Sequence, residues 1–249
     1  AAGGRGGGQG EGDGEGGVDG PGMRLFPAEE ATLGRAVEKR RREFTTGRLC
    51  AHRALAALGV EPVPILPGPR REPLWPAGVV GSITHCAGYR AAAVARADVL
   101  VSLGIDAEPN GPTPGGVLGE VALPEEQDML ARLARDHPGV CWDRLLFSAK
   151  ESVYKAWFPL ARRWLGFADA RLAFIPDPAA PAAPGGPDVP GPPGADVVST
   201  GVFTARLLVE GPSLPGGTLT GFTGRWVVRG GLIVTGIAVR PGQLSASSD

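Results

Sequence analysis

The order of helical and strand-like patterns constrains this fold more than any other feature of the sequence. Between Pro27 and Leu58, apolar residues recur at steps of three to four, which predicts helix, and Thr45-Thr46-Gly47 could divide it into two helices. Strand-like segments follow at Val79–His85, Tyr89–Arg96 and Leu100–Glu108, the first two joined by a short connector that suits a hairpin. The first part of the chain therefore consists of helices followed by strands.

The same order then recurs. Helical patterns cover Pro124–Arg135 and Trp142–Phe158, after a turn-rich stretch at 109–122. The strand candidates that close the chain are 169–175, 198–209, 218–229 and 231–239. We therefore expect an α+β fold in which two similar α/β halves pack as a pseudo-dimer. No internal sequence repeat is visible, so this expectation rests on the order of the elements.

Glycine and proline are concentrated in two segments. Residues 1–22 hold 12 glycines, and residues 176–194 hold 8 prolines. Such compositions cannot bury enough apolar surface to fold, so we expect a disordered tail and a loop there. The expected organisation is this tail at 1–22, an N-terminal half at 23–109, a C-terminal half at 110–243 that includes the loop at 176–194, and a flexible tail at 244–249.

Charge and composition exclude several classes of protein. Lys and Arg number 25 against 26 Asp and Glu, a net charge of −1, whereas a nucleic-acid binder would carry a basic excess. We find neither a signal peptide nor an apolar run near the roughly 18–20 residues that span a bilayer. Three scattered cysteines do not make a disulfide framework. We expect a cytoplasmic protein that binds neither nucleic acid nor membrane.

Acidic and basic residues suggest a phosphate chemistry. Asp106 and Glu108 alternate along a strand and so share one face, where two carboxylates suit Mg²⁺, although they could also be two solvated charges. On the helix at 142–158, Glu151 lies one turn before Lys155, and Lys150 immediately precedes Glu151. This set could complete a metal site and hold a pyrophosphate, or be an ordinary Glu–Lys helix pair.

Other residues could bind phosphate groups. Thr84 and His85 lie where a strand enters a turn, and the alternative is a histidine hydrogen-bonded within a hairpin. Six arginines have forked side chains that could bind phosphate, although they could also form a solvated surface: Arg40, Arg41, Arg42, Arg48, Arg70 and Arg71. Pairs of Cys and His lack the Cys-x-x-Cys spacing of a zinc site.

Taken together, these motifs resemble one family. After Arg48 come Gly-Ser-Ile-Thr-His at 81–85, Gly-Ile-Asp-Ala-Glu at 104–108 and Phe-Ser-Ala-Lys-Glu-Ser-Val-Tyr-Lys-Ala at 147–156. This ordered set resembles the 4′-phosphopantetheinyl transferases, in their larger, pseudo-dimeric bacterial type. Trp157-Phe158-Pro159-Leu160 further resembles actinobacterial members.

The resemblance implies an enzyme of the holo-[acyl-carrier-protein] synthase type. Such an enzyme moves the 4′-phosphopantetheine arm of coenzyme A to a serine of an apo acyl or peptidyl carrier protein and releases 3′,5′-ADP, with Mg²⁺ or Mn²⁺. The implied metal ligands are Asp106, Glu108 and Glu151. The implied catalytic residues are Glu151, as base, and Lys155. The implied coenzyme A contacts are Arg40, Arg48, Gly68, Arg70, Arg71, Thr84, His85, Asp106, Lys150, Glu151, Lys155 and Leu165.

Two other functions compete with this one: a metal-dependent phosphodiesterase or nuclease, and a non-catalytic carrier-binding module. Within the family, the sequence leaves open the preferred carriers, the docking surface, whether Arg70 or Arg71 contacts coenzyme A, and whether Glu151 acts directly or through water. The resemblance also implies a monomer.

Overall fold

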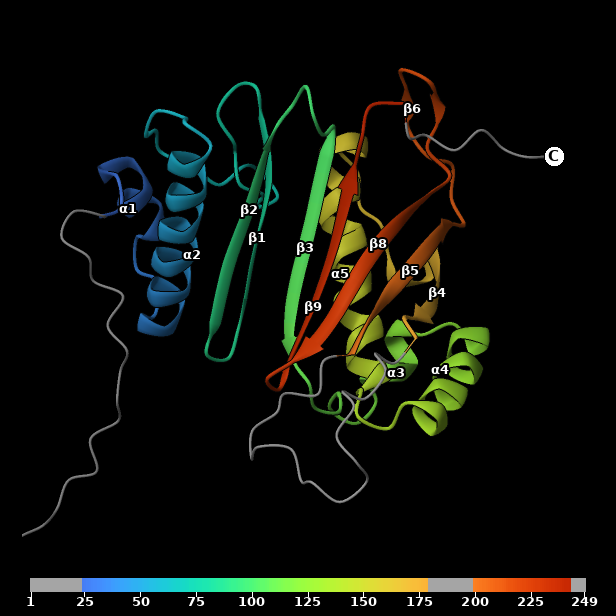
Figure 1. Cartoon of the computed structure of the whole chain (residues 1–249). Coiled ribbons are helices and arrows are strands. Elements are labelled where there is room, and N and C mark those ends of the chain that lie inside the picture. Colours follow the sequence, from blue (N-terminus) through green and yellow to red (C-terminus); the bar gives the residue numbers. More distant parts are fainter. Residues whose placement is uncertain (1–23, 179–198, 243–249) are drawn as a thin grey trace, which may run out of the picture.

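The computed structural model describes residues 24–178 and 199–242. The two expected tails and residues 179–194 of the expected loop lie outside these described residues. In the part that is described, an N-terminal helical layer, a β-hairpin and a larger sheet follow one another across the molecule (Figure 1).

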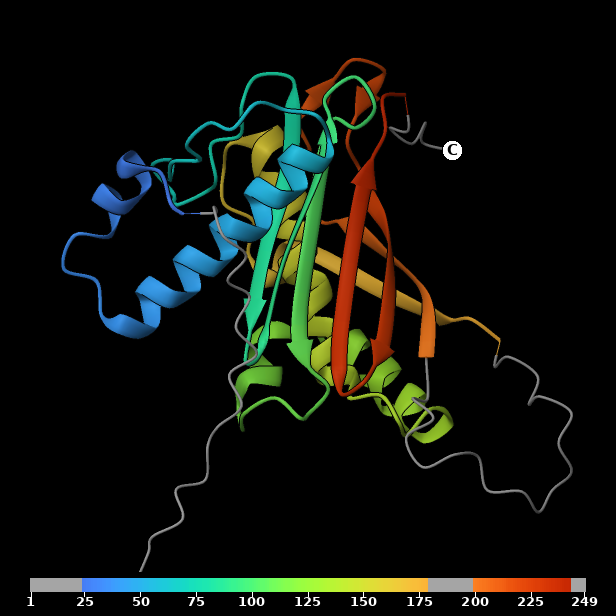
Figure 2. The same ribbon diagram turned by 60° about the vertical axis from the view of Figure 1, so that its left-hand side comes forward.

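The N-terminal elements are α1 (Pro27–Leu33), α2 (Glu38–Ala57), β1 (Val79–Cys86) and β2 (Tyr89–Arg96). The break between the helices falls at Gly34, whose φ of 44° ends α1, and α2 continues through Thr45-Thr46-Gly47, where we had placed a division. The hairpin turns at Ala87-Gly88, as its short connector predicted. Figure 2 shows α2 lying obliquely to this hairpin, and Ala51 and Leu55 of α2 are buried against it.

The rest of the chain forms a second α+β unit. Its elements are β3 (Ser102–Pro109), α3 (Val117–Val121), α4 (Pro124–Asp136), α5 (Trp142–Ala161), the 3₁₀ turn η1 (Phe167–Asp169), β4 (Ala170–Pro176), β5 (Ser199–Leu207), β6 (Ser213–Leu214), β7 (Gly217–Thr218), β8 (Gly221–Arg229) and β9 (Leu232–Val239). Five strands make one antiparallel sheet in the order β3-β9-β8-β5-β4. The α+β class and its two helix-on-strand halves are as the sequence predicted. Helix α3 was not predicted, because it lies in the stretch at 109–122 that was expected to consist of turns.

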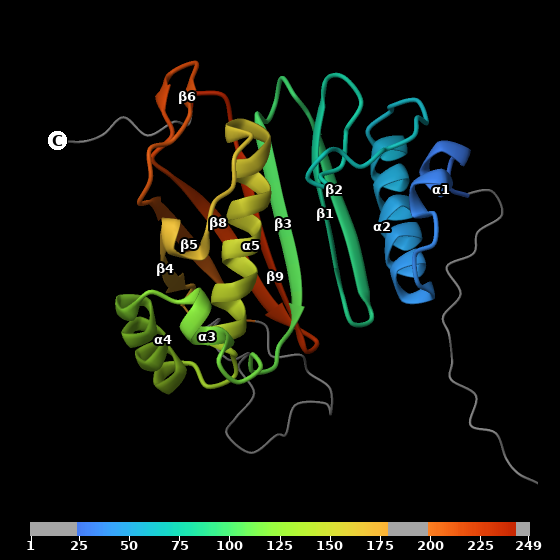
Figure 3. The same cartoon turned by 180° about the vertical axis from the view of Figure 1, so that it is seen from behind.

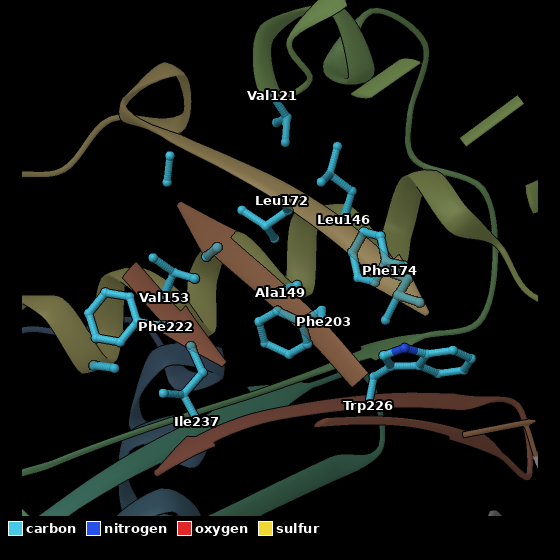
Figure 4. Packing of buried hydrophobic residues seen from close by; sticks show 14 of the residues in the cluster. Val121, Leu146, Ala149, Val153, Leu172, Phe174, Phe203, Phe222, Trp226 and Ile237 are labelled. Atoms are coloured by element: carbon cyan, nitrogen blue, oxygen red, sulfur yellow. The ribbon is translucent and has the colours of Figure 1, made fainter. Parts of the chain in front are cut away.

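Helix α5 lies across one face of the five-stranded sheet, with α3 and α4 at one end of it (Figure 3). The side chains between helix and sheet form the main core, in which Ala149 and Val153 of α5 face Phe203 and Ile237 of the sheet (Figure 4). Burial of such apolar surface is the main force that holds α5 in place. None of the helices in the described ranges has both the length and the apolar character needed to cross a membrane.

The two halves meet where β1 runs beside β3. Within the described residues these strands share no backbone ladder. Instead the amide of Ile105 donates to Ser82 Oγ, and the amide of Ala107 donates to Thr84 Oγ1, both at 3.0 Å. The contacts advance in the same direction on both strands, so β1 and β3 run parallel. Although β3 precedes the expected boundary at 109/110, it lies in the sheet of the C-terminal half.

Gly104 of β3 allows α5 to approach closely. A Cβ at this position would lie 2.1 Å from the carbonyl oxygen of Ser152 and 2.7 Å from the amide nitrogen of Ala156. Both atoms are helix backbone and cannot swing aside. We therefore predict that Gly104→Ala destabilises the protein by about 1–3 kcal/mol, toward the upper end of the range for overpacking.

Gly236, on the neighbouring strand β9, is the matched control. A Cβ there would meet nothing closer than Ile105 Cγ2 at 3.8 Å. Thermal and urea unfolding of both variants should show a fall in midpoint for Gly104→Ala that Gly236→Ala does not share. Equal midpoints would contradict the close approach.

Candidate active site

A cavity of about 800 Å³ lies where the two halves meet. Its walls come from α2, β1, the loop before β1, the start of β3 and the C-terminal half of α5. The predicted site residues that line it are Arg40, Arg48, Arg70, Arg71, His85, Glu151 and Lys155. The structure thus brings together residues that are up to 115 positions apart in the chain.

An ion pair between Asp106 and Lys155 occupies the junction of the halves. Lys155 Nζ donates to Asp106 Oδ1 at 2.7 Å and to the carbonyl oxygen of Ile105 at 3.1 Å. Thr84 Oγ1 donates to the same Oδ1 at 3.1 Å. The other oxygen, Oδ2, is buried and has no hydrogen-bond partner among the described residues. A buried carboxylate oxygen without a partner is costly, so Asp106 is set up to accept a further ligand.

The three predicted metal ligands influence one another. Burial raises the pKa of Glu151; Lys155 opposes this rise, and the charges of Asp106 and Glu108 add to it. Burial and Asp106 likewise raise the pKa of Glu108, whose Oε2 accepts from Arg144 Nη1 at 3.1 Å. As they stand in the described residues, no three acidic, His or Cys side chains are grouped to hold a metal. The donor set nevertheless fits Mg²⁺, because it offers hard oxygens, mutual repulsion and the free Oδ2 of Asp106.

Thr84 and His85 have different environments. Thr84 is buried, and its hydroxyl is engaged on both sides, since it accepts from Ala107 and donates to Asp106. Its predicted phosphate contact is therefore replaced by a role in the junction of β1 and β3. The side chain of His85 is exposed on the cavity wall. Partial desolvation lowers its pKa, Glu43 opposes this, and the nearby cations lower it further, so the neutral ring is favoured.

Lys150 does not join Lys155. Its side chain is 2% exposed, and Nζ donates to Glu126 Oε2 and to the carbonyl oxygen of Phe167, both at 2.7 Å. Burial lowers the pKa of Lys150, while the hydrogen bond and the charge of Glu126 oppose the shift. A contact with pyrophosphate would require breaking this buried pair. The structure therefore corrects the predicted placement of Lys150.

Arg48 offers an unsatisfied cation to the cavity. It is 6% exposed, its guanidinium stacks 4.6 Å from the ring centroid of Phe44, and its Nε is buried with no partner in the described part of the chain. Burial lowers the pKa of Arg48, Glu29 opposes this, and Arg40 lowers it further. Because a buried guanidinium without a counter-ion is costly, an anion in the cavity would relieve it.

The loop before β1 contributes two exposed arginines. Gly68 forms a tight turn, in which its amide donates to the carbonyl oxygen of Glu72 at 2.7 Å and a Cβ would collide with the Glu72 carboxylate. Arg70 and Arg71 follow on this turn and both line the cavity. The structure therefore keeps both arginines as candidates for a phosphate contact.

Leu165 lies apart from the main cavity. It is 6% exposed and lines a smaller cavity of about 130 Å³, together with Tyr154, Trp164 and Phe167. Glu151 lines both cavities, so they adjoin at this residue. The apolar walls of the smaller one suit a slender, uncharged chain.

Comparison with known proteins places the chain in a family. A family model described as the 4′-phosphopantetheinyl transferase N-terminal domain matches residues 28–95, and one described as the 4′-phosphopantetheinyl transferase superfamily matches residues 102–188. The chain is 54% identical over 221 residues to 4′-phosphopantetheinyl transferase Svp of Streptomyces mobaraensis, covering 89% of this chain and 81% of that protein. It belongs to the 4′-phosphopantetheinyl transferase superfamily.

Further relatives agree. The chain is 47% identical over 222 residues to 4′-phosphopantetheinyl transferase PptT of Mycobacterium tuberculosis, covering 89% of this chain and 88% of that protein. It is also 37% identical over 137 residues to enterobactin synthase component D of Escherichia coli K12, covering 53% of this chain and 62% of that protein. The predicted family and enzyme class, a coenzyme A-dependent transferase acting on carrier proteins, are confirmed, and the nuclease and non-catalytic alternatives are set aside.

Sequence reasoning missed several residues of the transferase site. Arg144 holds Glu108, Trp75 forms an aromatic wall of the cavity, and Glu126 pairs with Lys150. The sequence around Glu126 did contain a recognisable pattern. An apolar residue, a proline and a glutamate two residues later are typical of the start of a helix. Arg144 and Trp75 carried none, since only the fold brings them to the site.

The environment of Arg48 predicts its contribution to binding. Arg48→Gln removes a buried guanidinium whose Nε has no hydrogen-bond partner among the described residues, so we expect the affinity for coenzyme A to fall at least about tenfold, or about 1.4 kcal/mol. Isothermal titration calorimetry measures this directly. The exposed Arg132 on α4 lies away from the cavity, and Arg132→Gln should bind coenzyme A as the wild type does. Unchanged affinity in Arg48→Gln would remove this residue from the site.

Proposed function

We propose that this transferase binds coenzyme A in the cavity between its halves and transfers the phosphopantetheine arm there in a Mg²⁺-dependent reaction. The observation that carries the proposal is the Asp106–Lys155 pair, which places an ammonium group beside a carboxylate oxygen that has no partner in the described part of the chain. The phosphopantetheine acceptor that we propose is an apo acyl or peptidyl carrier protein, and the proposed working form is a cytoplasmic monomer.

The proposed metal ligands are Asp106, Glu108 and Glu151. Bound there, Mg²⁺, or Mn²⁺ in its place, would neutralise charge on the pyrophosphate and fix its orientation. Burial raises the pKa of both Glu108 and Glu151, and the charge of Asp106 adds to each rise, which supports this assignment because crowded carboxylates favour a shared cation. Arg144 keeps Glu108 at the edge of the group by an ion pair that is about four-fifths buried.

The cationic walls of the cavity supply the proposed nucleotide contacts. Arg48 is the proposed partner of the 3′-phosphate end, because its Nε is buried and unpaired among the described residues. Arg40 lies on the same helix and lines the same cavity. His85 and one or both of Arg70 and Arg71 are the proposed partners of the remaining phosphate oxygens. The smaller cavity beside Leu165 is the proposed path of the pantetheine arm.

Glu151 is the proposed base and Lys155 the proposed charge stabiliser. The serine hydroxyl of the carrier gives its proton to Glu151, directly or through a water, and its oxygen bonds to the phosphorus atom that carries pantetheine. The bond from that phosphorus to the bridging oxygen breaks, and 3′,5′-ADP leaves with the electron pair. Lys155, which lines the cavity and is 26% exposed, stabilises the charge that develops on the leaving group.

The metal assignment predicts that chelation abolishes transfer. Intact-mass analysis of an apo carrier incubated with enzyme and coenzyme A should show no modification in EDTA and full modification after excess Mg²⁺ or Mn²⁺. Asp106→Asn should lower the rate about 100-fold or more, because it removes the charged ligand while keeping a similar shape. Asp128→Asn, on the exposed face of α4, is the control. Full activity in chelator would refute metal dependence.

The geometry of Lys155 predicts that arginine cannot replace it. Lys155 Nζ is a compact donor that fits between a carboxylate and a backbone carbonyl, whereas a guanidinium is a wider planar fork. We expect Lys155→Arg to lower kcat at least about tenfold although the net charge is unchanged, because small misplacements cost rate heavily. Steady-state kinetics with the carrier checks this. Wild-type kinetics would leave Lys155 no role beyond its charge.

A further inference from the structure

Two glutamates, one in each half, lie in matching buried environments. Glu29 is 0% exposed and Glu126 is 1% exposed, and each is the third residue of a helix that begins with proline. The backbone amide of the residue before each helix donates to the Oε2 atom of its glutamate. These bonds run from Phe26 to Glu29 at 2.9 Å and from Leu123 to Glu126 at 2.8 Å.

The other bonds of the two glutamates also correspond. Oε1 of Glu29 accepts from the amide of Ile65 at 2.8 Å, and Oε1 of Glu126 accepts from the amide of Leu172 at 2.7 Å. Each carboxylate then receives one side chain from the long helix of its own half. His52 Nε2 lies 2.9 Å from Glu29 Oε1, and Lys150 Nζ lies 2.7 Å from Glu126 Oε2.

The correspondence extends to chain positions. His52 follows Glu29 by 23 residues, and Lys150 follows Glu126 by 24. The local sequences share the proline and the buried glutamate two residues after it, in Leu25-Phe26-Pro27-Ala28-Glu29-Glu30 and in Ala122-Leu123-Pro124-Glu125-Glu126-Gln127. The halves therefore do contain a repeat, which we had not seen from the sequence, and its centre is this carboxylate.

Each pair fixes a helix that faces the cavity. His52 lies one turn after Arg48 on α2, and Lys150 immediately precedes Glu151 on α5. The charge of Glu29 also reaches Arg48, whose pKa it raises against the effect of burial. Nδ1 of His52 is buried without a partner in the described ranges, so the hydrogen is best placed on Nε2, which donates to Glu29.

We propose that Glu29–His52 and Glu126–Lys150 are two equivalent positioning pairs with separate effects on the reaction. The first orients α2 and so sets coenzyme A binding through Arg48. The second orients α5 and so sets the rate of transfer through Glu151 and Lys155. The inference rests on the proposed function for the roles of those three residues.

The physical basis is that neither pair can be loosened locally. Each carboxylate joins three donors, two of them from segments distant in sequence, and the carboxylates themselves are buried, so water cannot readily replace a lost bond. Loss of a partner therefore shifts the helix, and the displaced catalytic group loses alignment. A merely structural pair would lower stability without separating binding from rate.

The experiment compares variants of the two pairs in the full chain. His52→Leu and Glu29→Gln break the first pair, and His52→Gln retains a donor that can reach Glu29. Lys150→Met and Glu126→Gln break the second pair. Glu30→Gln and Glu125→Gln are matched controls, because each alters the exposed neighbour of a buried glutamate.

Three quantities are measured: the Kd of coenzyme A by calorimetry, kcat at saturating coenzyme A, Mg²⁺ and carrier, and the thermal midpoint. We expect His52→Leu and Glu29→Gln to raise the Kd about fivefold or more with kcat within about twofold, and His52→Gln to recover most of the affinity. Lys150→Met and Glu126→Gln should lower kcat about tenfold or more with the Kd within about twofold. Both controls should match the wild type.

The double variant Glu126→Gln with Lys150→Met completes the design. Because both residues act through one pair, its loss of kcat should be no larger than that of the worse single variant. The double variant leaves no unpaired buried charge. If a single variant does not fold, the kcat of the double variant therefore tests whether this pair orients α5.

The proposal is overturned if both pairs change the same parameter, if the losses in the double variant add, or if midpoints fall while Kd and kcat stay at wild-type values. Failure of the proposed function is a different result. It would appear in the wild type itself, as absence of transfer to an apo carrier with coenzyme A and Mg²⁺.

Discussion

Two hydroxyl groups join the halves of this transferase at the place where a backbone ladder would otherwise run. The hydroxyl groups of Ser82 and Thr84 accept hydrogen bonds from the amides of Ile105 and Ala107. Without these hydroxyls, the two amides would be unpaired at the edge of β3. A hydroxyl between the strands separates them more than a direct amide-to-carbonyl bond does. The carbonyl oxygen of Ile105 is consequently free to accept from Lys155. The candidate active site thus lies where the described strands β1 and β3 share no backbone ladder.

The other side of β3 sets how far α5 stands from this junction. Because Gly104 has no side chain, α5 can approach β3 closely. Ser102 Oγ also donates to the carbonyl oxygen of Ala156 on α5 at 2.6 Å. On β9, Thr235 bonds to the hydroxyls of Ser148 and Ser152 at 3.0 and 2.6 Å. These polar contacts fix rotation of α5 about its axis, which apolar packing alone would leave adjustable. The orientation of α5 in turn determines where the side chains of Glu151 and Lys155 point.

Periodicity and turn chemistry were enough to predict most elements and the hairpin of β1 and β2, because both signals are local. The sequence could not tell which stripe of α5 faces inward, so Lys150 and Lys155 were assigned to one ligand although burial separates them. Thr84 was misjudged for a related reason: a strand-end hydroxyl is read as available until a neighbouring strand is known to use it. The sequence could not distinguish Gly34, whose φ of 44° ends α1, from Gly47, which lies within α2 and packs close to Ile83.

Lysine is rare in this chain, and its two positions on α5 have in common the kind of hydrogen-bond acceptors that surround them. Three of the 25 basic residues are lysine, and Lys150 and Lys155 each donate to one carboxylate and one backbone carbonyl. The three donors of a compact ammonium can serve two such acceptors at once, whereas a guanidinium is a wider planar fork. Arginine serves instead on the open cavity walls, where planar donors can meet phosphate oxygens. A chain that otherwise favours arginine thus keeps lysine at two positions on α5, once paired with the buried Glu126 and once paired with Asp106 at the wall of the cavity.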